Sequence, residues 1–485
     1  MSDQERERFT GMDDISCEKV GLKRGMKARH MLMMSIGGTI GTGLFLASGE
    51  VLQSAGPIGA ILAYLVAGLA MYAVMLCLAE LSVSMPIAGS FQTYATRLIS
   101  PAAGFTTGWL YWFNWLTVIS ADLVAAGTLT KVLIFDAFGL SVIQWGFLYA
   151  AILVLMNWVS VKFYGEMEFW FAGIKVAAII AFIIVGLGIA FGGVGNSPTP
   201  VGFSNLFPEE GIFPMGAAAV FMMGLLSVYS FQGTELVGVG AAECEDPGNN
   251  MKKVIKGVAF RIITFYVLAI IVLGMVLPWQ EAGVDESPFA KVFAIAGIPY
   301  ARELMNFVVL TSALSAANSA IYACSRFLWS MSVDKQAPKF LNSLNRGGVP
   351  GRAILFTIFM SIVLVLLGEV TNDTGDGNMA AKLYLWLVNS SGLVGCMIWI
   401  IIALCQLRFR KLFLFRGGDL KDLKFKAPWI PFLPILVMLI NGSLMFTTMF
   451  SDSERPLLIT ILLLTCLGYF GYQYFGPKED KQSGV

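Results

Sequence analysis

Long apolar stretches separated by short polar segments make up most of this 485-residue chain. A stretch of about 20 residues with few charges is long enough to cross a lipid bilayer as a helix. The sequence therefore predicts an all-α polytopic membrane protein with twelve transmembrane helices. The predicted spans are residues 31–53, 58–84, 104–131, 141–160, 169–191, 215–241, 254–277, 305–331, 353–367, 383–407, 430–450 and 457–474.

The first predicted span is interrupted by glycines. Residues 37–45 read Gly-Gly-Thr-Ile-Gly-Thr-Gly-Leu-Phe, so four glycines fall within seven residues. Each glycine costs roughly 1 kcal/mol relative to alanine in a helix, and we expect the backbone to unwind there. Irregular backbone at membrane depth persists only where it is buried in protein or lines a cavity. We therefore expect the amides of Thr42 and Gly43, at the start of the second half-helix, to bind an anionic group of a small solute.

The sixth predicted span carries a matching interruption. Residues 233–236 read Gly-Thr-Glu-Leu and repeat the frame Gly-Thr-Gly-Leu of residues 41–44, one set of five spans later. Two glycine-interrupted spans at corresponding places in two halves point to a substrate site between inverted repeats. Glu235 lies at the second break, where its carboxylate either receives a cationic group of the substrate or holds freed backbone amides.

Two further spans hold a charge at membrane depth, which costs a few kcal/mol or more without compensation. Asp122 shares a helical face with Asn114 and Trp115, and it serves either the solute site or a proton path, or only structural hydrogen bonds. Lys175 follows Glu166 by nine residues, about 13 Å along a helix. It is interpreted as a proton-coupling or fixed-cation residue, with a side chain that reaches back to the interface as the alternative.

Other polar groups in the spans have more local interpretations. Glu80 is predicted to pair with Arg97 or with freed backbone amides, unless it has a functional role. Ser315 and Asn318 stand in a segment of small residues, which is typical of close helix packing but also suits a cavity wall. Residues 389–392 form another polar patch at membrane depth.

Lys and Arg are concentrated in alternate loops. Seven of them fall within residues 408–426, whereas the loops 192–214 and 370–381 carry acidic residues and neither Lys nor Arg. The positive-inside rule then places both termini in the cytoplasm and requires an even number of spans.

The rest of the composition gives no sign of covalent chemistry. The seven cysteines include no CxxC pair and are expected to pack rather than to form disulfides or bind metal. His30 is the single histidine. With no nucleophile beside a base and no phosphate-binding loop, we expect neither an enzyme nor a metal, cofactor or nucleic-acid partner.

The motifs together resemble the amino acid transporter family of the amino acid/polyamine/organocation superfamily. They are the run 37–45, the segments Phe231–Leu236 and Glu243–Pro247, and Leu314-Ser-Ala-Ala-Asn-Ser. The likeness extends from about Lys23 to Tyr474. Within that family, Ala121–Ala126 and Tyr384–Asn389 look most like bacterial lysine permeases, while Gly297–Tyr300 and Lys426–Trp429 look as much like S-methylmethionine permeases.

The resemblance implies five-plus-five inverted repeats with helices 1 and 6 broken, and two peripheral helices. It divides the chain into a cytoplasmic tail (1–29), a first repeat (30–193), a second repeat (213–407), the last two spans (428–475) and a second cytoplasmic tail (476–485). It places the substrate carboxylate at the amides of Thr42 and Gly43, and the amino group at carbonyls near Thr39 and of Tyr229 or Phe231.

The same resemblance assigns the remaining residues of the site. Asn114, Trp115, Val118 and Asn318 would face the substrate side chain, and Lys175 would replace the ion of sodium-coupled relatives. The predicted substrate-binding residues are Thr39, Thr42, Gly43, Asn114, Trp115, Asp122, Tyr229, Phe231, Gly233, Glu235 and Asn318. The predicted proton-coupling residues are Lys175 and Glu243.

The expected function is proton-coupled import of L-lysine by alternating access across the bacterial inner membrane. The partners are then an amino acid, a proton and membrane lipid, and a sensor protein in the membrane is left open as a further partner. The alternatives are a permease or exchanger for S-methylmethionine, arginine or histidine, and an amino-acid-sensing membrane receptor.

Overall fold

The computed structural model describes residues 38–85, 87, 89–134, 137–159, 161–194, 200–236, 263–345, 348–372, 379–452 and 454–475. All regular structure in these ranges is helical, and no strand occurs there. Eight of the described helices are long and apolar enough to cross a membrane, and three shorter apolar helices accompany them: Val142–Trp158, Ala217–Phe231 and Ile263–Val276. The prediction of an all-α polytopic membrane protein is confirmed, while the count of twelve spans and the inverted repeat stay predictions.

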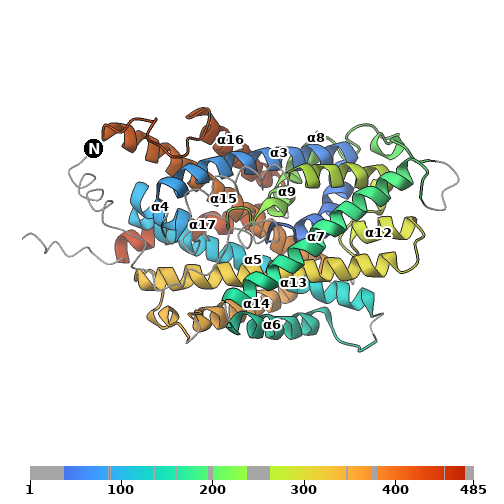
Figure 1. Cartoon of the computed structure of the whole chain (residues 1–485), viewed down its shortest axis with the longest axis horizontal. Coiled ribbons are helices and arrows are strands. Elements are labelled where there is room, and N and C mark those ends of the chain that lie inside the picture. The colour runs from blue at the N-terminus through green and yellow to red at the C-terminus, as the bar shows by residue number, and fades with distance from the viewer. Residues whose placement is uncertain are drawn as a thin grey trace, which may run out of the picture.

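The long helices run along the long axis of the molecule (Figure 1). They are α3 (Ser48–Ser84), α5 (Pro101–Leu133), α6 (Val142–Val159), α7 (Val161–Ala190), α13 (Ala301–Val333), α14 (Gly351–Asn372), α15 (Met379–Phe415), α16 (Phe432–Thr447) and α17 (Arg455–Phe475). The short elements are the π-helix η2 (Gly43–Ala47), the helices α4 (Ser90–Leu98), α8 (Ala217–Met222), α9 (Gly224–Phe231) and α12 (Pro288–Ile295), and the 3₁₀ turns η3 (Ser204–Leu206), η5 (Trp279–Glu281), η6 (Lys339–Asn342) and η7 (Thr448–Phe450).

Helix α3 contains the end of the first predicted span and all of the second. The two parts meet at a kink where Gly56 has φ +74° and ψ 172°, a conformation that favours glycine. Pro57 follows and has no amide hydrogen to continue the hydrogen-bond ladder. The Gly-Pro pair therefore folds one continuous apolar stretch back on itself.

Helix α5 lies at the centre of the bundle. It packs most extensively against α13 and α15, and it also contacts α4, α6, α14 and α17. Large aromatic side chains fill the space beside it: the ring of Tyr111 lies 4.6 Å from that of Phe91 and 4.7 Å from that of Phe327. Residues carried on the middle of α5 are therefore held rigidly and away from lipid.

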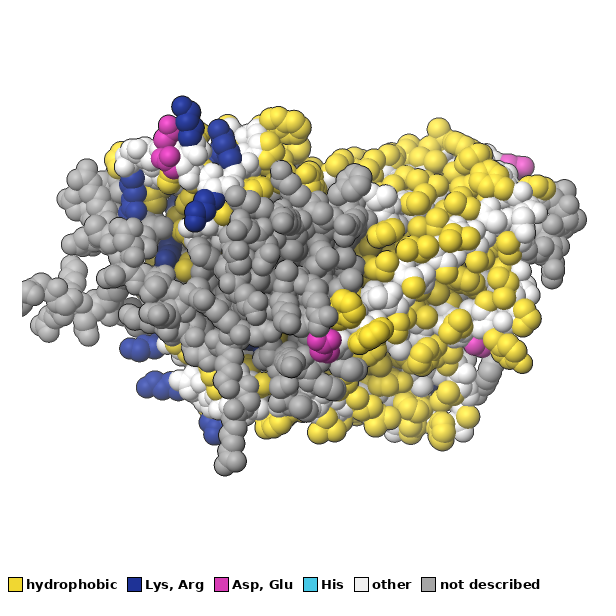
Figure 2. Space-filling model, viewed as in Figure 1, with side chains coloured by type: hydrophobic (Ala, Val, Ile, Leu, Met, Phe, Trp, Pro, Cys, Tyr) yellow, Lys and Arg dark blue, Asp and Glu magenta, His cyan; other side chains and the backbone are white. Residues whose placement is uncertain are grey.

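The surface is apolar over a broad region. Hydrophobic side chains cover much of the face in Figure 2, and Lys and Arg gather toward one end of it. Helices α16 and α17 are peripheral, since only 33% of the apolar stretch of α16 and 11% of that of α17 are buried within the protein. Such a surface is expected where lipid rather than water is the solvent.

Candidate functional site

The first glycine-rich interruption is a true break in the helix. Ile40 and Gly41 bend out of helical structure, and the π-helix η2 follows directly. Hydroxyl groups from five distant positions donate to its carbonyl oxygens at 2.7–3.1 Å: Tyr266 to Thr39, Ser312 to Ile40, Tyr384 to Thr42, Tyr64 to Gly43 and Ser287 to Phe45. The irregular backbone is thus satisfied by protein, as membrane depth requires.

The second interruption begins where α9 ends at Phe231. Gln232 is extended with ψ 153°, and Gly233 has φ +98°. The amide of Gly233 donates to both carboxylate oxygens of Glu235, at 3.2 and 3.3 Å. Of the two interpretations of Glu235, the structure shows it holding a freed backbone amide, and contact with a substrate cation stays a prediction.

The two breaks touch each other through glycine. A Cβ added at Gly43 would lie 2.6 Å from Cα of Ser230, and one added at Gly233 would lie 2.6 Å from the carbonyl oxygen of Gly38. Only glycine lets two backbones approach this closely. The two interrupted segments therefore form one compact junction.

Thr42 connects this junction to α5. Its hydroxyl donates to Oδ1 of Asp122 at 2.6 Å and lies 3.0 Å from the hydroxyl of Tyr229. Thr42 and Asp122 are each only 1% exposed. Oδ2 of Asp122 has no hydrogen-bond partner among the described residues. A buried acceptor of this kind is costly unless something completes it, which makes this position a candidate for ligand contact.

Lys175 is buried beside two carboxylates. It is 1% exposed, so its side chain does not reach the protein surface, and its charge interacts with those of Glu168 and Asp122. Glu168 is equally buried and accepts from the hydroxyl of Ser315, which lies 2.9 Å from each of its oxygens. Glu168 was not among the residues predicted from the sequence, although its spacing of seven residues from Lys175, which places both on one helical face, was a usable signal.

Asn114 belongs to a closed polar network. Its Nδ2 donates to Oε1 of Gln232 at 2.9 Å, and the hydroxyl of Ser391 lies 3.0 Å from Oδ1 of Asn114 and 2.8 Å from Oε1 of Gln232. Gln232 in turn donates to the carbonyl of Ser391 at 2.9 Å. This network ties the second break to α5 and α15. Gln232 was also missed, because nothing in the sequence indicates which amide faces which helix.

The remaining predicted residues lie around the breaks. Asn318 accepts from Nδ2 of Asn157 at 2.6 Å. The ring of Phe231 lies 4.9 Å from that of Tyr266. Trp115 is 2% exposed, and its Nε1 has no hydrogen-bond partner among the described residues. Glu243 lies outside the described residues.

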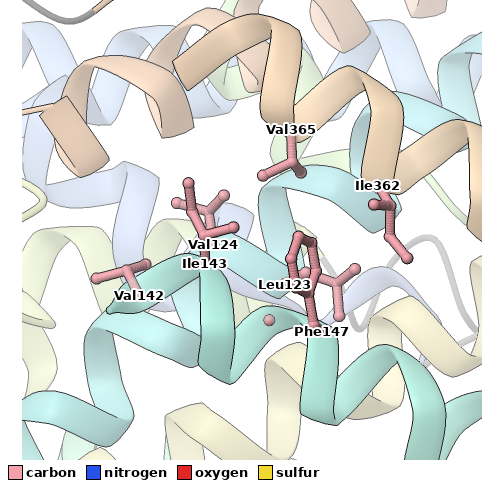
Figure 3. Close-up of a pocket in the computed structure, with 8 residues that line it drawn as sticks. Leu123, Val124, Val142, Ile143, Phe147, Ile362 and Val365 are labelled. Atoms are coloured by element: carbon pink, nitrogen blue, oxygen red, sulfur yellow. The ribbon is translucent and has the colours of Figure 1, made fainter. Parts of the chain in front are cut away.

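A cavity of about 170 Å³ reaches the first break. Leu46 of η2 and Tyr384, which donates to the carbonyl of Thr42, belong to its wall together with Thr128 and Asp285. A second hollow, of about 10 Å³, lies between α5, α6 and α14 and is lined only by apolar residues such as Leu123, Ile143 and Ile362 (Figure 3). Only the larger cavity adjoins polar groups of the junction.

Glu80 does not pair with Arg97. Its carboxylate receives two hydrogen bonds of 2.7 Å from Arg410, one of 3.1 Å from Gln406 and one of 2.6 Å from the amide of Ala427. The prediction of Arg97 was wrong because α15 extends to Phe415 and carries Arg410 alongside Glu80. Glu80 does accept from a backbone amide, but that amide belongs to Ala427 in the loop before α16.

A second ion pair, outside the long helices' apolar segments, ties the loop before α12 to α13. Arg302 donates to Glu286 at 2.7 and 2.6 Å, and Asn306 donates at 3.0 Å. Burial would raise the pKa of Glu286, but these hydrogen bonds outweigh it and hold the pKa below its ordinary value. The pair therefore adds stability that is present above a pH of about 4.3, the ordinary pKa of Glu, and is lost as the pH falls through the lowered native pKa.

No group of three or more His, Cys, Asp or Glu that could hold a metal ion occurs in the part of the chain that the structure describes. Cys77, Cys324, Cys396 and Cys405 are free thiols buried among helices, and Cys466 is free and exposed. The polar groups gathered at the junction can bind and orient a small charged solute.

Comparison with known proteins agrees with this geometry. The chain is 42% identical to the amino-acid permease RocC of Bacillus subtilis over 454 residues, which is 93% of this chain and 94% of the relative. It is 41% identical to a putative histidine permease of the same organism, covering 93% and 94%. It is 39% identical to the lysine-specific permease LysP of Escherichia coli, covering 87% and 86%.

A family profile described as amino acid permease matches residues 30–479. That range contains both breaks, Asp122, Lys175 and all residues that line the larger cavity. The proteins of this family are transporters rather than enzymes, and the small-molecule ligand that the relatives imply is an amino acid. The chain belongs to the amino acid permease family, within the amino acid/polyamine/organocation superfamily.

Proposed function

We propose that this chain is a proton-coupled symporter that imports L-lysine by alternating access. The observation that carries the proposal is the contact of Thr42, in the broken first span, with Asp122, whose charge interacts with that of the buried Lys175. The helix break, which suits an amino acid, is thereby connected through Asp122 to the buried Lys175, a group that can gain or lose a proton.

The backbone would recognise the part that all amino acids share. The amides of Thr42 and Gly43 begin a half-helix, whose partial positive charge favours the substrate carboxylate. The amino group would be received by carbonyls near Thr39 and of Tyr229 or Phe231. The carbonyl of Thr39 already accepts from Tyr266, but a carbonyl oxygen has two lone pairs and can accept a second donor.

Side chains around the junction would select among amino acids. Asp122 offers an oxygen with no partner among the described residues, which suits the ammonium group of a cationic side chain. Trp115, Val118 and Asn318 would contact the aliphatic part. Support for lysine comes from the relatives named lysine-specific permeases, and the presence of a putative histidine permease and a gamma-aminobutyric acid permease among the relatives makes specificity the main point to test.

Transport requires an architecture that exposes the site to each side in turn. We propose five-plus-five inverted repeats over residues 30–193 and 213–407, with 428–475 peripheral, in the bacterial inner membrane with both tails in the cytoplasm. The support is the matching pair of breaks and the charge of the loops. Rocking of one helix bundle against the rest would then carry the amino acid across.

Uptake by the purified protein in proteoliposomes tests the proposal. Labelled lysine should accumulate when the outside is more acidic than the inside, and a protonophore should abolish the accumulation. Arginine, histidine, S-methylmethionine and gamma-aminobutyric acid would be offered as competitors. If excess lysine leaves the uptake of the labelled amino acid unchanged, lysine is not the substrate. Uptake that occurs only when the proteoliposomes are preloaded with substrate indicates an exchanger. Binding without uptake indicates a receptor.

The coupling residue has a separate test. Lys175→Ala should abolish accumulation driven by the pH gradient while substrate binding remains measurable, because the mutation removes the ionisable group and not the break. Lys339→Ala, which changes an exposed lysine in η6, is the matched control and should transport normally. Gradient-dependent uptake at the wild-type level in Lys175→Ala rules out this role.

A further inference from the structure

Glu168 stands on the same face of α7 as Lys175. Seven residues separate them, which is two helical turns and about 10 Å of rise. Side chains on a helix lean toward its N-terminus, so the side chain of Lys175 leans toward the turn that carries Glu168. The two charges interact, and each residue is 1% exposed.

Helix α13 holds the Glu168 carboxylate in place. The hydroxyl of Ser315 lies 2.9 Å from both oxygens, and α13 packs directly against α7. The charge of Asp122 from α5 also acts on Lys175. The described part of α6 carries no charged residue, and Lys291 of α12 is engaged with the carbonyl of Glu281 and with Asp285.

The charges of this cluster do not balance when all its groups are ionised. One ammonium faces two carboxylates, which leaves a net negative charge in a site without solvent contact. A buried net charge is strongly unfavourable. While Lys175 is charged, the cluster is therefore neutral only when one carboxylate holds a proton, and the three groups titrate as one unit.

We propose that Glu168 is the carboxylate that exchanges the coupled proton with Lys175. This rests on the proposed proton-coupled transport. Asp122 accepts from Thr42 and so senses the break, whereas Glu168 lies nearer the start of α7, the end that the loop charges assign to the cytoplasm. When Lys175 passes its proton on, an N–H bond breaks at Nζ and an O–H bond forms on the Glu168 carboxyl group. The ion pair becomes a neutral pair, and the proton then leaves to water on the inner side once that side opens.

The variant Glu168→Gln tests the proposal, because it keeps the shape and a hydrogen-bond partner for Ser315 but cannot accept the proton. Accumulation driven by a pH gradient should fall about 100-fold, the loss expected when a positioned proton acceptor is removed. Lysine binding and exchange of labelled for unlabelled lysine at equal pH should stay close to the wild-type level. Glu168→Asp should restore part of the accumulation, and Ser315→Ala, which keeps both carboxylates, should retain most of it.

Each outcome decides a separate point. Accumulation by Glu168→Gln at the wild-type level overturns the proposal. The proposal is also overturned if Glu168→Gln elutes as a folded protein but loses both lysine binding and exchange, since that loss indicates a structural role. If Glu168→Gln does not fold, gradient-driven accumulation by Glu168→Asp is compared with that by Ser315→Ala. The proposal is overturned if Ser315→Ala accumulates less lysine than Glu168→Asp. Wild-type protein without gradient-driven uptake refutes the proposed function itself, whereas an uncoupled Lys175→Ala beside a coupled Glu168→Gln refutes only the role of Glu168.

Discussion

At the scale of single residues, Thr42 joins three parts of the site. Its hydroxyl contacts Asp122 on α5 and Tyr229 on α9, and its carbonyl accepts from Tyr384 on α15. A threonine contributes one hydroxyl hydrogen and two acceptor lone pairs, so both side-chain contacts are satisfied by one group. Removing the Thr42 hydroxyl would change the hydrogen bonding of the junction with little change in side-chain volume.

Thr42→Val should therefore weaken lysine binding and uptake about tenfold or more, because Asp122 then loses its donor in a site closed to water, at a cost of about 1–3 kcal/mol. Thr42→Ser keeps the hydroxyl and should transport close to wild type. The measurements are the Kd for lysine and the initial rate of uptake.

The matched control is Thr128→Val. Thr128 lies on the same helix as Asp122 and lines the cavity, but its hydroxyl donates only to the backbone of its own helix. If Thr128→Val and Thr42→Val affect uptake equally, the contact with Asp122 has no special role.

Some of these residues could be predicted from the sequence and others could not. Asp122 and Lys175 were detectable because a charge in an apolar stretch is rare. Glu168 stood just before the predicted start of its span, beside Glu166, where a carboxylate is ordinary. The hydroxyls of Tyr64, Tyr266 and Tyr384 gave no signal, because their use as donors to residues 39–43 depends on tertiary packing.

At the scale of elements, glycine spacing located both breaks, while helix ends were less predictable. The predicted tenth span ended at residue 407, but α15 continues to Phe415. Its charged extension remains helical there because Arg410 pairs with Glu80 and with the carbonyl of Ala427. An interaction between residues so far apart in the chain cannot be read from local hydropathy.

Gly233 provides the test at this scale. Gly233→Ala places a side chain at φ +98° and a Cβ 2.6 Å from a backbone oxygen of the other break. Strained backbone of this kind costs about 1–3 kcal/mol before any clash. We expect uptake to fall more than about tenfold and the melting temperature in detergent to decrease.

Two glycines provide matched controls. Gly216 has φ +85° with nothing within 4 Å of an added Cβ, so Gly216→Ala isolates the backbone strain. Gly442 lies inside α16 with open space around it, and Gly442→Ala should be neutral or slightly stabilising. If Gly233→Ala behaves like Gly216→Ala, the contact between the breaks does not matter for transport.

At the scale of the whole molecule, the segments between the apolar helices differ in charge. The segment after α15 carries Lys421, Lys424 and Lys426, and the segment before α8 carries Glu209 and Glu210 without Lys or Arg. Figure 2 shows the basic side chains gathered toward one end of the apolar surface. This asymmetry is what the positive-inside rule uses to fix orientation.

Cysteine labelling in whole cells tests that orientation. Glu209 and Lys421 are both exposed, so a cysteine at either position meets solvent without disturbing the packed helices. A membrane-impermeant maleimide should label Glu209→Cys in intact cells and Lys421→Cys only after permeabilisation, because the positive-inside rule predicts that the acidic loop faces outward and the basic loop faces the cytoplasm. The unsubstituted chain, with its seven native cysteines, gives the background. The reverse pattern would invert the topology and, with it, place Glu168 on the outer side of Lys175, which the proposed direction of proton release does not allow.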